Sequence, residues 1–393
     1  MNRNFWIIAL IAFINALSYT VLIPIIYLYG KQFGLNDFET SLLFAIYSLA
    51  QFFATPVIGK LSDRFGRKPL LVISLLGTVI ANYMAGIAAT AGILFFARFL
   101  DGITGGNVSV AQAVISDVTT PATRAKAFGI FGASFGLGFI LGPVISLLAQ
   151  EISLGASFIA SAAFAFVGLV ITIFFLPETL KKEDRSTGNV FDLGLDKLIT
   201  GLFIPKIGIL LVINFLIGTT FTMFTYAFQP YFLTVLKQTN QTLTLMFLLF
   251  GVLGVIMQTS GISILNRKYS VVNILLLGIF VRSLCFLLMP VIPNIIYFVV
   301  VAILFASLNS VVQPMISTLI TLNAKPEEQG IVIGLNSSYL SISNAIGPIL
   351  AGVLVNQSNP STYAYPLYFA GISTFMVLFF AVRNQRKFTP NMS

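Results

Sequence analysis

Arg98 and Asp101 stand three positions apart in the otherwise apolar stretch "RFLDGITGG". At this spacing two side chains lie on neighbouring faces of one helix and can form an ion pair. Ionisable groups in apolar surroundings are costly and usually functional. If Arg98 moved away, the ability of Asp101 to bind a proton would change. Two interpretations stay open: a proton-coupling pair with Arg98 also contacting a substrate, and a static ion pair that orients its helix.

The composition indicates a membrane protein. Of the 393 residues, 57% are hydrophobic and 9% are charged, and the mean hydropathy is +0.95, outside the range of soluble globular domains. Apolar runs long enough to cross a bilayer as helices recur along the chain. The expected fold class is an all-α membrane protein with twelve transmembrane helices in two pseudo-symmetric six-helix bundles. The expected spans are approximately 5–29, 41–60, 70–90, 93–115, 126–149, 154–176, 206–234, 241–265, 271–290, 294–320, 329–354 and 366–383.

One long polar segment divides the chain. It predicts an N-terminal six-helix bundle at 1–176, a cytoplasmic linker at 177–205 and a C-terminal six-helix bundle at 206–393. Lysines and arginines gather in the loops on one side of the expected spans, whereas the opposite loops keep Lys31 and Lys237. Because cytoplasmic loops carry the excess of positive charge, both termini are expected in the cytoplasm. The protein is expected to be multi-pass, in a plasma membrane or a bacterial inner membrane.

The two halves repeat one another. The pair Gly142-Pro143 returns 205 positions later as Gly347-Pro348, and the same offset carries "RAKAFG" onto "QGIVIG". Related halves in one membrane chain are typical of transporters whose substrate site lies near the middle of the membrane.

Several segments resemble the motifs of one family. "GKLSDRFGRKPLL", from Gly59 to Leu71, resembles the signature loop of the major facilitator superfamily, and it would turn between the second and third spans. "RFLDGITGG" is similar to the family's second motif, "GLGFILGP" resembles the antiporter motif, and "ISDVTTPATRAKAFG" resembles the tetracycline-type exporters. The resemblance implies the major facilitator fold and proton-coupled efflux of small amphipathic compounds by alternating access.

The same resemblance implies roles for particular residues. Asp63 would sit against the start of the eleventh span, near Glu327 to Gly330, and Arg67 would reach Asp117. This conformational latch comprises Gly59, Asp63, Arg64, Gly66, Arg67 and Asp117, and the antiporter motif comprises Gly132, Gly136, Gly142 and Pro143. The alternatives are a topology anchor for the loop and ordinary glycine packing for the helix.

Polar positions within apolar helices outline a neutral, aromatic cavity. The candidate substrate-binding residues are Asn15, Tyr19, Tyr47, Gln51, Asn107, Gln112, Tyr226, Gln229, Asn309, Gln313, Asn336 and Tyr339. Each alone is more often a helix-to-helix hydrogen bond. A neutral pocket suits drug-like molecules better than sugars or phosphates. The alternative function is proton-coupled transport of a specific metabolite such as a sugar or an organic acid.

Other classes of protein are poorly supported. No enzyme, cofactor or metal site is expected, because the chain has no histidine and one cysteine. An ATP-driven pump would need a glycine-rich phosphate loop, which the sequence lacks. A nucleic-acid-binding protein is not indicated either, because the basic residues form no stripe. A receptor or scaffold would need no repeated halves. The expected partners are a small-molecule substrate, protons and the lipid bilayer, and a monomer is expected.

Overall fold

Long apolar helices make up the protein. The computed structural model describes residues 3–186, 195–324 and 329–389, and these ranges contain no β-strand. Ten of the expected spans are confirmed as helices long and apolar enough to cross a membrane. They are α3 (Asp37–Phe65), α4 (Arg67–Gly86), α7 (Pro121–Gln150), α8 (Leu154–Phe175), α10 (Ile207–Pro230) with η2 (Tyr231–Val235), α11 (Asn240–Ile256) with η3 (Met257–Gly261) and α12 (Ile262–Asn266), α13 (Val271–Leu288), α14 (Ile295–Asn323), α15 (Gln329–Leu354), and α16 (Tyr365–Phe388) with η4 (Pro360–Ala364).

The first and fourth expected spans are interrupted helices. α1 (Arg3–Thr20) is separated from α2 (Ile26–Gln32) by a turn that contains Pro24, which has no backbone N–H to donate. α5 (Ala91–Thr104) is separated from α6 (Asn107–Val118) by Gly105 and Gly106. The count of twelve spans therefore stays a prediction for these two. Between the halves lie the short elements η1 (Lys182–Asp184) and α9 (Leu195–Gly201).

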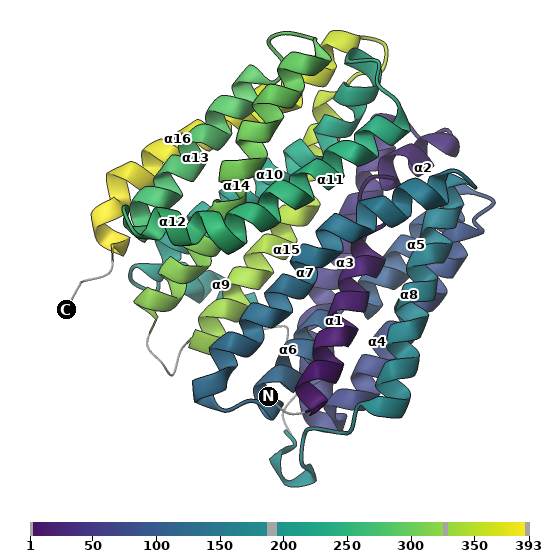
Figure 1. The fold of residues 1–393 in the computed structure, drawn as a ribbon, viewed down its shortest axis with the longest axis vertical. Helices are drawn as coiled ribbons and strands as arrows, with labels where there is room; N and C mark the ends of the chain where they lie inside the picture. The colour runs from purple at the N-terminus through teal and green to yellow at the C-terminus, as the bar shows by residue number, and fades with distance from the viewer. Residues whose placement is uncertain (1–2, 187–194, 325–328, 390–393) are drawn as a thin grey trace. The chain divides into compact units, whose positions relative to one another are not determined.

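The helices form two compact units. Unit 1 comprises the described residues of 3–35, 46–186 and 244–251, and unit 2 comprises those of 36–45, 195–243, 252–324 and 329–389. In unit 1, α1 packs against α7 and α8, and α4 packs against α5 and α8 (Figure 1). In unit 2, α10 packs against α15 and α16, and α13 packs against α14 and α16. The continuous helix α3 is shared, because its first turns group with unit 2 and the rest groups with unit 1.

Each unit has its own apolar core, and many large apolar side chains also lie outside it. Ile8, Leu71 and Val114 are buried in unit 1, and Leu211 and Ile316 are buried in unit 2. The outward-facing side chains include Ile73, Phe174, Ile296 and Phe379. In water such exposure would be unfavourable. A multi-pass membrane protein exposes these side chains to lipid instead.

Candidate functional site

Arg98 and Asp101 form a buried ion pair in α5, as the spacing of three predicts. Arg98 Nη1 lies 2.9 Å from Asp101 Oδ2, and the two residues expose 3% and 7% of their surface. The guanidinium of Arg98 lies over the ring of Tyr47, 4.3 Å from its centroid, where the face of the ring attracts a cation. Arg98 Nε has no hydrogen-bond partner among the described residues. One N–H of a desolvated guanidinium is thus left to bind an acceptor.

Three further candidates gather at this ion pair. The rings of Tyr19 in α1 and Tyr47 in α3 stack with their centroids 6.2 Å apart. Gln51 Nε2 donates to Tyr47 Oη at 3.2 Å and to the Gly105 carbonyl at 3.0 Å. Tyr19 is 43% exposed, so its ring can be reached by a ligand. Unit 1 thus assembles one aromatic and ionic cluster from helices that are distant in the sequence, comprising Tyr19, Tyr47, Gln51, Arg98 and Asp101.

The break between α5 and α6 lies next to this cluster. A Cβ atom at Gly106 would lie 2.6 Å from Ile58 Cγ2, so glycine is needed for α3 to pass this closely. The carbonyl of Gly105 accepts its hydrogen bond from the Gln51 side chain. Interrupted helices occur at the substrate sites of transporters, because the freed backbone groups can face a cavity.

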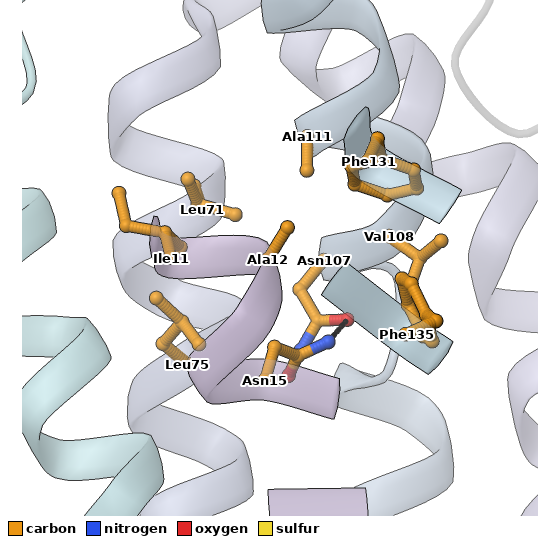
Figure 2. Close-up of a pocket in the computed structure, with 10 residues that line it drawn as sticks. All are labelled: Ile11, Ala12, Asn15, Leu71, Leu75, Asn107, Val108, Ala111, Phe131 and Phe135. Atoms are coloured by element: carbon orange, nitrogen blue, oxygen red, sulfur yellow. Dashed lines mark hydrogen bonds between the residues drawn. The ribbon is translucent and has the colours of Figure 1, made fainter. Parts of the chain in front are cut away.

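Asn15 and Asn107 face each other beside a small pocket in unit 1. Asn107 Nδ2 donates to Asn15 Oδ1 at 2.9 Å, and Asn15 Nδ2 donates to Asn107 Oδ1 at 3.3 Å. Figure 2 shows the two amides joined at one side of the pocket, among apolar side chains. The apolar lining residues are Ile11, Ala12, Leu71, Leu75, Val108, Ala111, Phe131 and Phe135. The two amides here satisfy one another's hydrogen bonds. If the side chains moved apart, their N–H donors and carbonyl acceptors could bind a ligand instead.

The predicted latch residues form a network at the junction of α3 and α4. Arg67 pairs with Asp63, and Arg67 Nε donates to Asp117 Oδ2 at 3.2 Å. Arg67 Nη1 also donates to Ser62 Oγ at 2.8 Å. Arg64 is exposed and lies over the ring of Phe65 instead. The predicted contact of Asp63 with the segment from Glu327 to Gly330 stays a prediction, because residues 325–328 lie outside the described residues.

The turn itself is shorter than predicted. α3 continues to Phe65, so Gly59 lies within a helix and does not form the turn. Only Gly66 separates α3 from α4, and its φ of +113° is a conformation that favours glycine. Of the two glycines in the predicted loop, Gly59 and Gly66, the tight turn therefore requires only Gly66.

Two residues that the sequence did not single out complete the network. The Glu178 carboxylate accepts from the backbone N–H groups of Arg67 and Lys68 at 2.9 and 3.2 Å, which satisfies free donors at the start of α4. Thr179 Oγ1 donates to Asp117 Oδ2 at 3.0 Å. The signal that could have found them is the Glu-Thr pair directly after Pro177, two residues beyond the end of α8.

Gly138 and Gly142 bring α7 into direct contact with α1. A Cβ atom at Gly142 would lie 2.7 Å from Thr20 Cβ, and one at Gly138 would lie 2.9 Å from Ala16 Cβ. Thr20 Oγ1 donates to the Gly138 carbonyl at 2.8 Å. At Gly132, by contrast, a Cβ would meet nothing within 4 Å. Close glycine packing therefore occurs in the second half of α7, where Pro143 of the antiporter motif is also buried.

Unit 2 repeats this contact between α10 and α15. Thr222 Oγ1 donates to the Ser343 carbonyl at 2.8 Å, and a Cβ at Gly347 would lie 2.5 Å from the Thr219 carbonyl oxygen. Ser343 and Gly347 stand 205 positions after Gly138 and Gly142. The repeat seen in the sequence is therefore a repeated helix-to-helix contact.

Several unit 2 candidates bond to neighbouring backbone or side chains. Asn336 Oδ1 accepts from Asn214 Nδ2 at 2.6 Å, and Tyr339 Oη donates to the Leu198 carbonyl at 2.8 Å. Tyr226 Oη donates to the Asp37 carbonyl. Gln229 Nε2 donates within α10, to the Thr225 carbonyl at 3.1 Å. Asn309 and Gln313 in α14 are half-buried, as is Gln112 in α6 of unit 1. The structure does not gather these residues into one cluster.

Arg282 is buried in unit 2, and its bonds go to backbone and hydroxyl groups. Its Nη2 donates to the Ile217 carbonyl at 2.5 Å and to Thr220 Oγ1 at 3.0 Å. The guanidinium also lies within 5.4 Å of the Phe221 ring centroid and within 5.2 Å of that of Phe286. These contacts tie α13 to α10 and fit a structural role.

The fold and these motifs define a secondary active transporter of small molecules that spans the membrane several times. The chain matches the Major Facilitator Superfamily over residues 8–257 and 210–391, and it belongs to this family. It is 30% identical over 375 residues to the Tetracycline resistance protein, class B, of Escherichia coli, which covers 92% of this chain and 90% of that protein. It is 27% identical over 363 residues to Multidrug resistance protein 1 of Bacillus subtilis, which covers 92% of this chain and 91% of that protein.

Solved structures confirm the fold. The nucleoside transporter NupG has a TM-score of 0.77 at 14% identity and covers 97% of this chain and 99% of its own. The human organic anion transporter MFSD10 has a TM-score of 0.73 at 19% identity and covers 97% of this chain and 100% of its own. At such identities the likeness concerns the fold alone.

Proposed function

We propose that this transporter exports small amphipathic, drug-like compounds in exchange for protons. The observation that carries the proposal is the buried Arg98–Asp101 ion pair beside the stacked rings of Tyr19 and Tyr47. At this place a group that can bind and release a proton lies beside an aromatic surface that can bind a ligand. The likeness over 92% of the chain to a tetracycline resistance protein and a multidrug resistance protein supports drug-like compounds as the substrates.

The aromatic cluster supplies the ligand-binding surface. Flat, partly apolar molecules stack on tyrosine rings, and a cationic ligand gains attraction from the face of a ring. Asn15 and Asn107 add amide donors and acceptors next to the break between α5 and α6. We propose that the remaining candidates, Gln112, Gln229, Asn309, Gln313, Asn336 and Tyr339, adapt to different ligands by exchanging their present partners.

Asp101 is the proposed proton carrier. While Arg98 stays within 2.9 Å, the carboxylate is neutralised by its partner. A cationic ligand on the tyrosine rings would favour the ionised carboxylate and so displace its proton, whereas protonation of Asp101 would weaken the binding of that ligand. Ligand and proton would therefore bind alternately at this site, as exchange requires.

The latch network and the glycine contacts are proposed to control the change of shape. Release of Arg67 from Asp63 and Asp117 would free the junction of α3 and α4 when the cytoplasmic side opens. Gly142 and Gly347 would keep α1 on α7 and α10 on α15 as rigid pairs during this movement. We further propose a monomer in the cell membrane with both termini in the cytoplasm and no enzymatic activity.

The test is transport in inside-out membrane vesicles with and without an imposed proton gradient. The probes are ethidium and tetracycline as drug-like compounds, and a sugar and an organic acid as metabolites. We expect gradient-dependent accumulation of a drug-like probe, its loss in Asp101→Asn, and its retention in the matched variant Asp196→Asn, whose side chain is exposed in α9. Accumulation of the metabolites alone, or full activity of Asp101→Asn, would contradict the proposal.

A further inference from the structure

Asp37 is a buried acid that the proposed mechanism does not use. It is the first residue of α3 and exposes 2% of its surface. Its Oδ2 accepts a hydrogen bond from Tyr363 Oη at 2.9 Å, and its backbone carbonyl accepts one from Tyr226 Oη. Both tyrosines are buried as well. A carboxylate withdrawn from water is stable only when such bonds compensate it, so these contacts fix the start of α3.

The next turns of α3 are held equally closely. A Cβ at Gly352 of α15 would lie 2.5 Å from Ser41 Oγ and 3.1 Å from Phe38 Cα, so the two helices touch without intervening side chains. The ring of Phe44 packs edge-on against that of Tyr226, with the centroids 5.5 Å apart. Residues 36–45 accordingly group with unit 2, whereas the rest of α3 groups with unit 1.

α3 therefore carries an aspartate contact at each of its two ends. Asp63 pairs with Arg67 near the last turn, and Asp37 bonds to Tyr363 and Tyr226 at the first. The helix is continuous from Asp37 to Phe65 and contains Pro56, so the two aspartate contacts lie at opposite ends of one helix.

We propose that residues 36–45 form the outer gate of the transporter, held by the bonds of Asp37 to Tyr363 and Tyr226. The gate opens when these bonds break and the start of α3 leaves Gly352. Tyr226, a predicted substrate contact, acts here as a gate residue. The inference rests on the proposed orientation, which puts the start of α3 on the outer side of the membrane.

The experiment measures opening of the gate by chemical labelling in intact cells. Cys285, the one cysteine of the chain, is replaced by alanine, and Ser41→Cys supplies the reporter. Ser41 is fully buried, so a membrane-impermeant maleimide reaches it only when the gate opens. Tyr363→Phe removes one hydroxyl, and the matched control Tyr365→Phe removes one from a residue that is 50% exposed.

We expect Tyr363→Phe to raise the labelling rate about tenfold, as loss of a hydrogen bond to a charged acceptor implies. Asp37→Ala should raise it at least as much, and Tyr365→Phe should leave it unchanged. Thr40→Cys, at a second fully buried position, repeats the measurement if Ser41→Cys expresses poorly. Equal labelling of Tyr363→Phe and Tyr365→Phe in folded protein, or labelling in inside-out vesicles but not in intact cells, would overturn the proposal. Labelling requires neither a proton gradient nor export, so failure of proton-coupled export would not alter this result.

Discussion

Replacing Gly142 by alanine should force α1 and α7 apart. The added Cβ would lie 2.7 Å from Thr20 Cβ, whereas carbon atoms rest about 3.5–4.0 Å apart. The helices would have to separate by roughly 1 Å or distort, and overpacking of this kind costs about 1–3 kcal/mol. Separation would also weaken the bond from Thr20 Oγ1 to the Gly138 carbonyl, now 2.8 Å long. We therefore expect lower stability and reduced transport.

Gly129 provides the matched control on the same helix, because a Cβ there would meet nothing within 4 Å. Alanine is favoured over glycine within a helix by about 1 kcal/mol, so Gly129→Ala should be neutral or stabilising. The two variants are compared by thermal unfolding in detergent and by transport in vesicles. Adding Thr20→Gly to Gly142→Ala should recover part of the lost stability. Equal unfolding temperatures for Gly129→Ala and Gly142→Ala would refute the reasoning.

Three further predictions concern individual side chains. Asp101→Asn should abolish export driven by a pH gradient while binding of ethidium to the purified protein persists; loss of binding would point to a purely structural ion pair. Asp63→Asn should shift the population toward the inward-open shape, and unchanged spin-label distances across the cytoplasmic side would exclude the latch. Glu178→Gln should lower stability by about 1 kcal/mol through a weaker cap on α4, and an unfolding temperature equal to that of the unmutated protein would argue against this cap.

Much of the fold follows from patterns that the sequence displays directly. Apolar runs must become helices in lipid, because no other open structure satisfies their backbone groups there. The spacing of Arg98 and Asp101 fixes their pairing, and the offset between Gly142 and Gly347 predicts equivalent contacts in the two halves. These features depend on neighbours along one helix or on repetition.

The remaining features depend on contacts between distant segments. The Gly105-Gly106 pair is a local signal for a helix break, but the close approach of Ile58 in α3 to Gly106 appears only in the folded chain. Asp37 looks like a loop acid, yet Tyr363, far along the chain, buries it. The sequence predicts a turn that begins at Gly59, but α3 has no local signal that ends it before Gly66. Tertiary packing decides each of these cases.

The most direct test of proton-coupled export is the movement of protons that the substrate itself causes. Purified protein is reconstituted in liposomes that contain a pH-sensitive dye, and a gradient of ethidium or tetracycline is imposed without any pH difference. We predict that protons move in the direction opposite to the substrate and that Asp101→Asn stops this movement. Substrate flux without proton movement, or protons moving in the same direction as the substrate, would contradict the account.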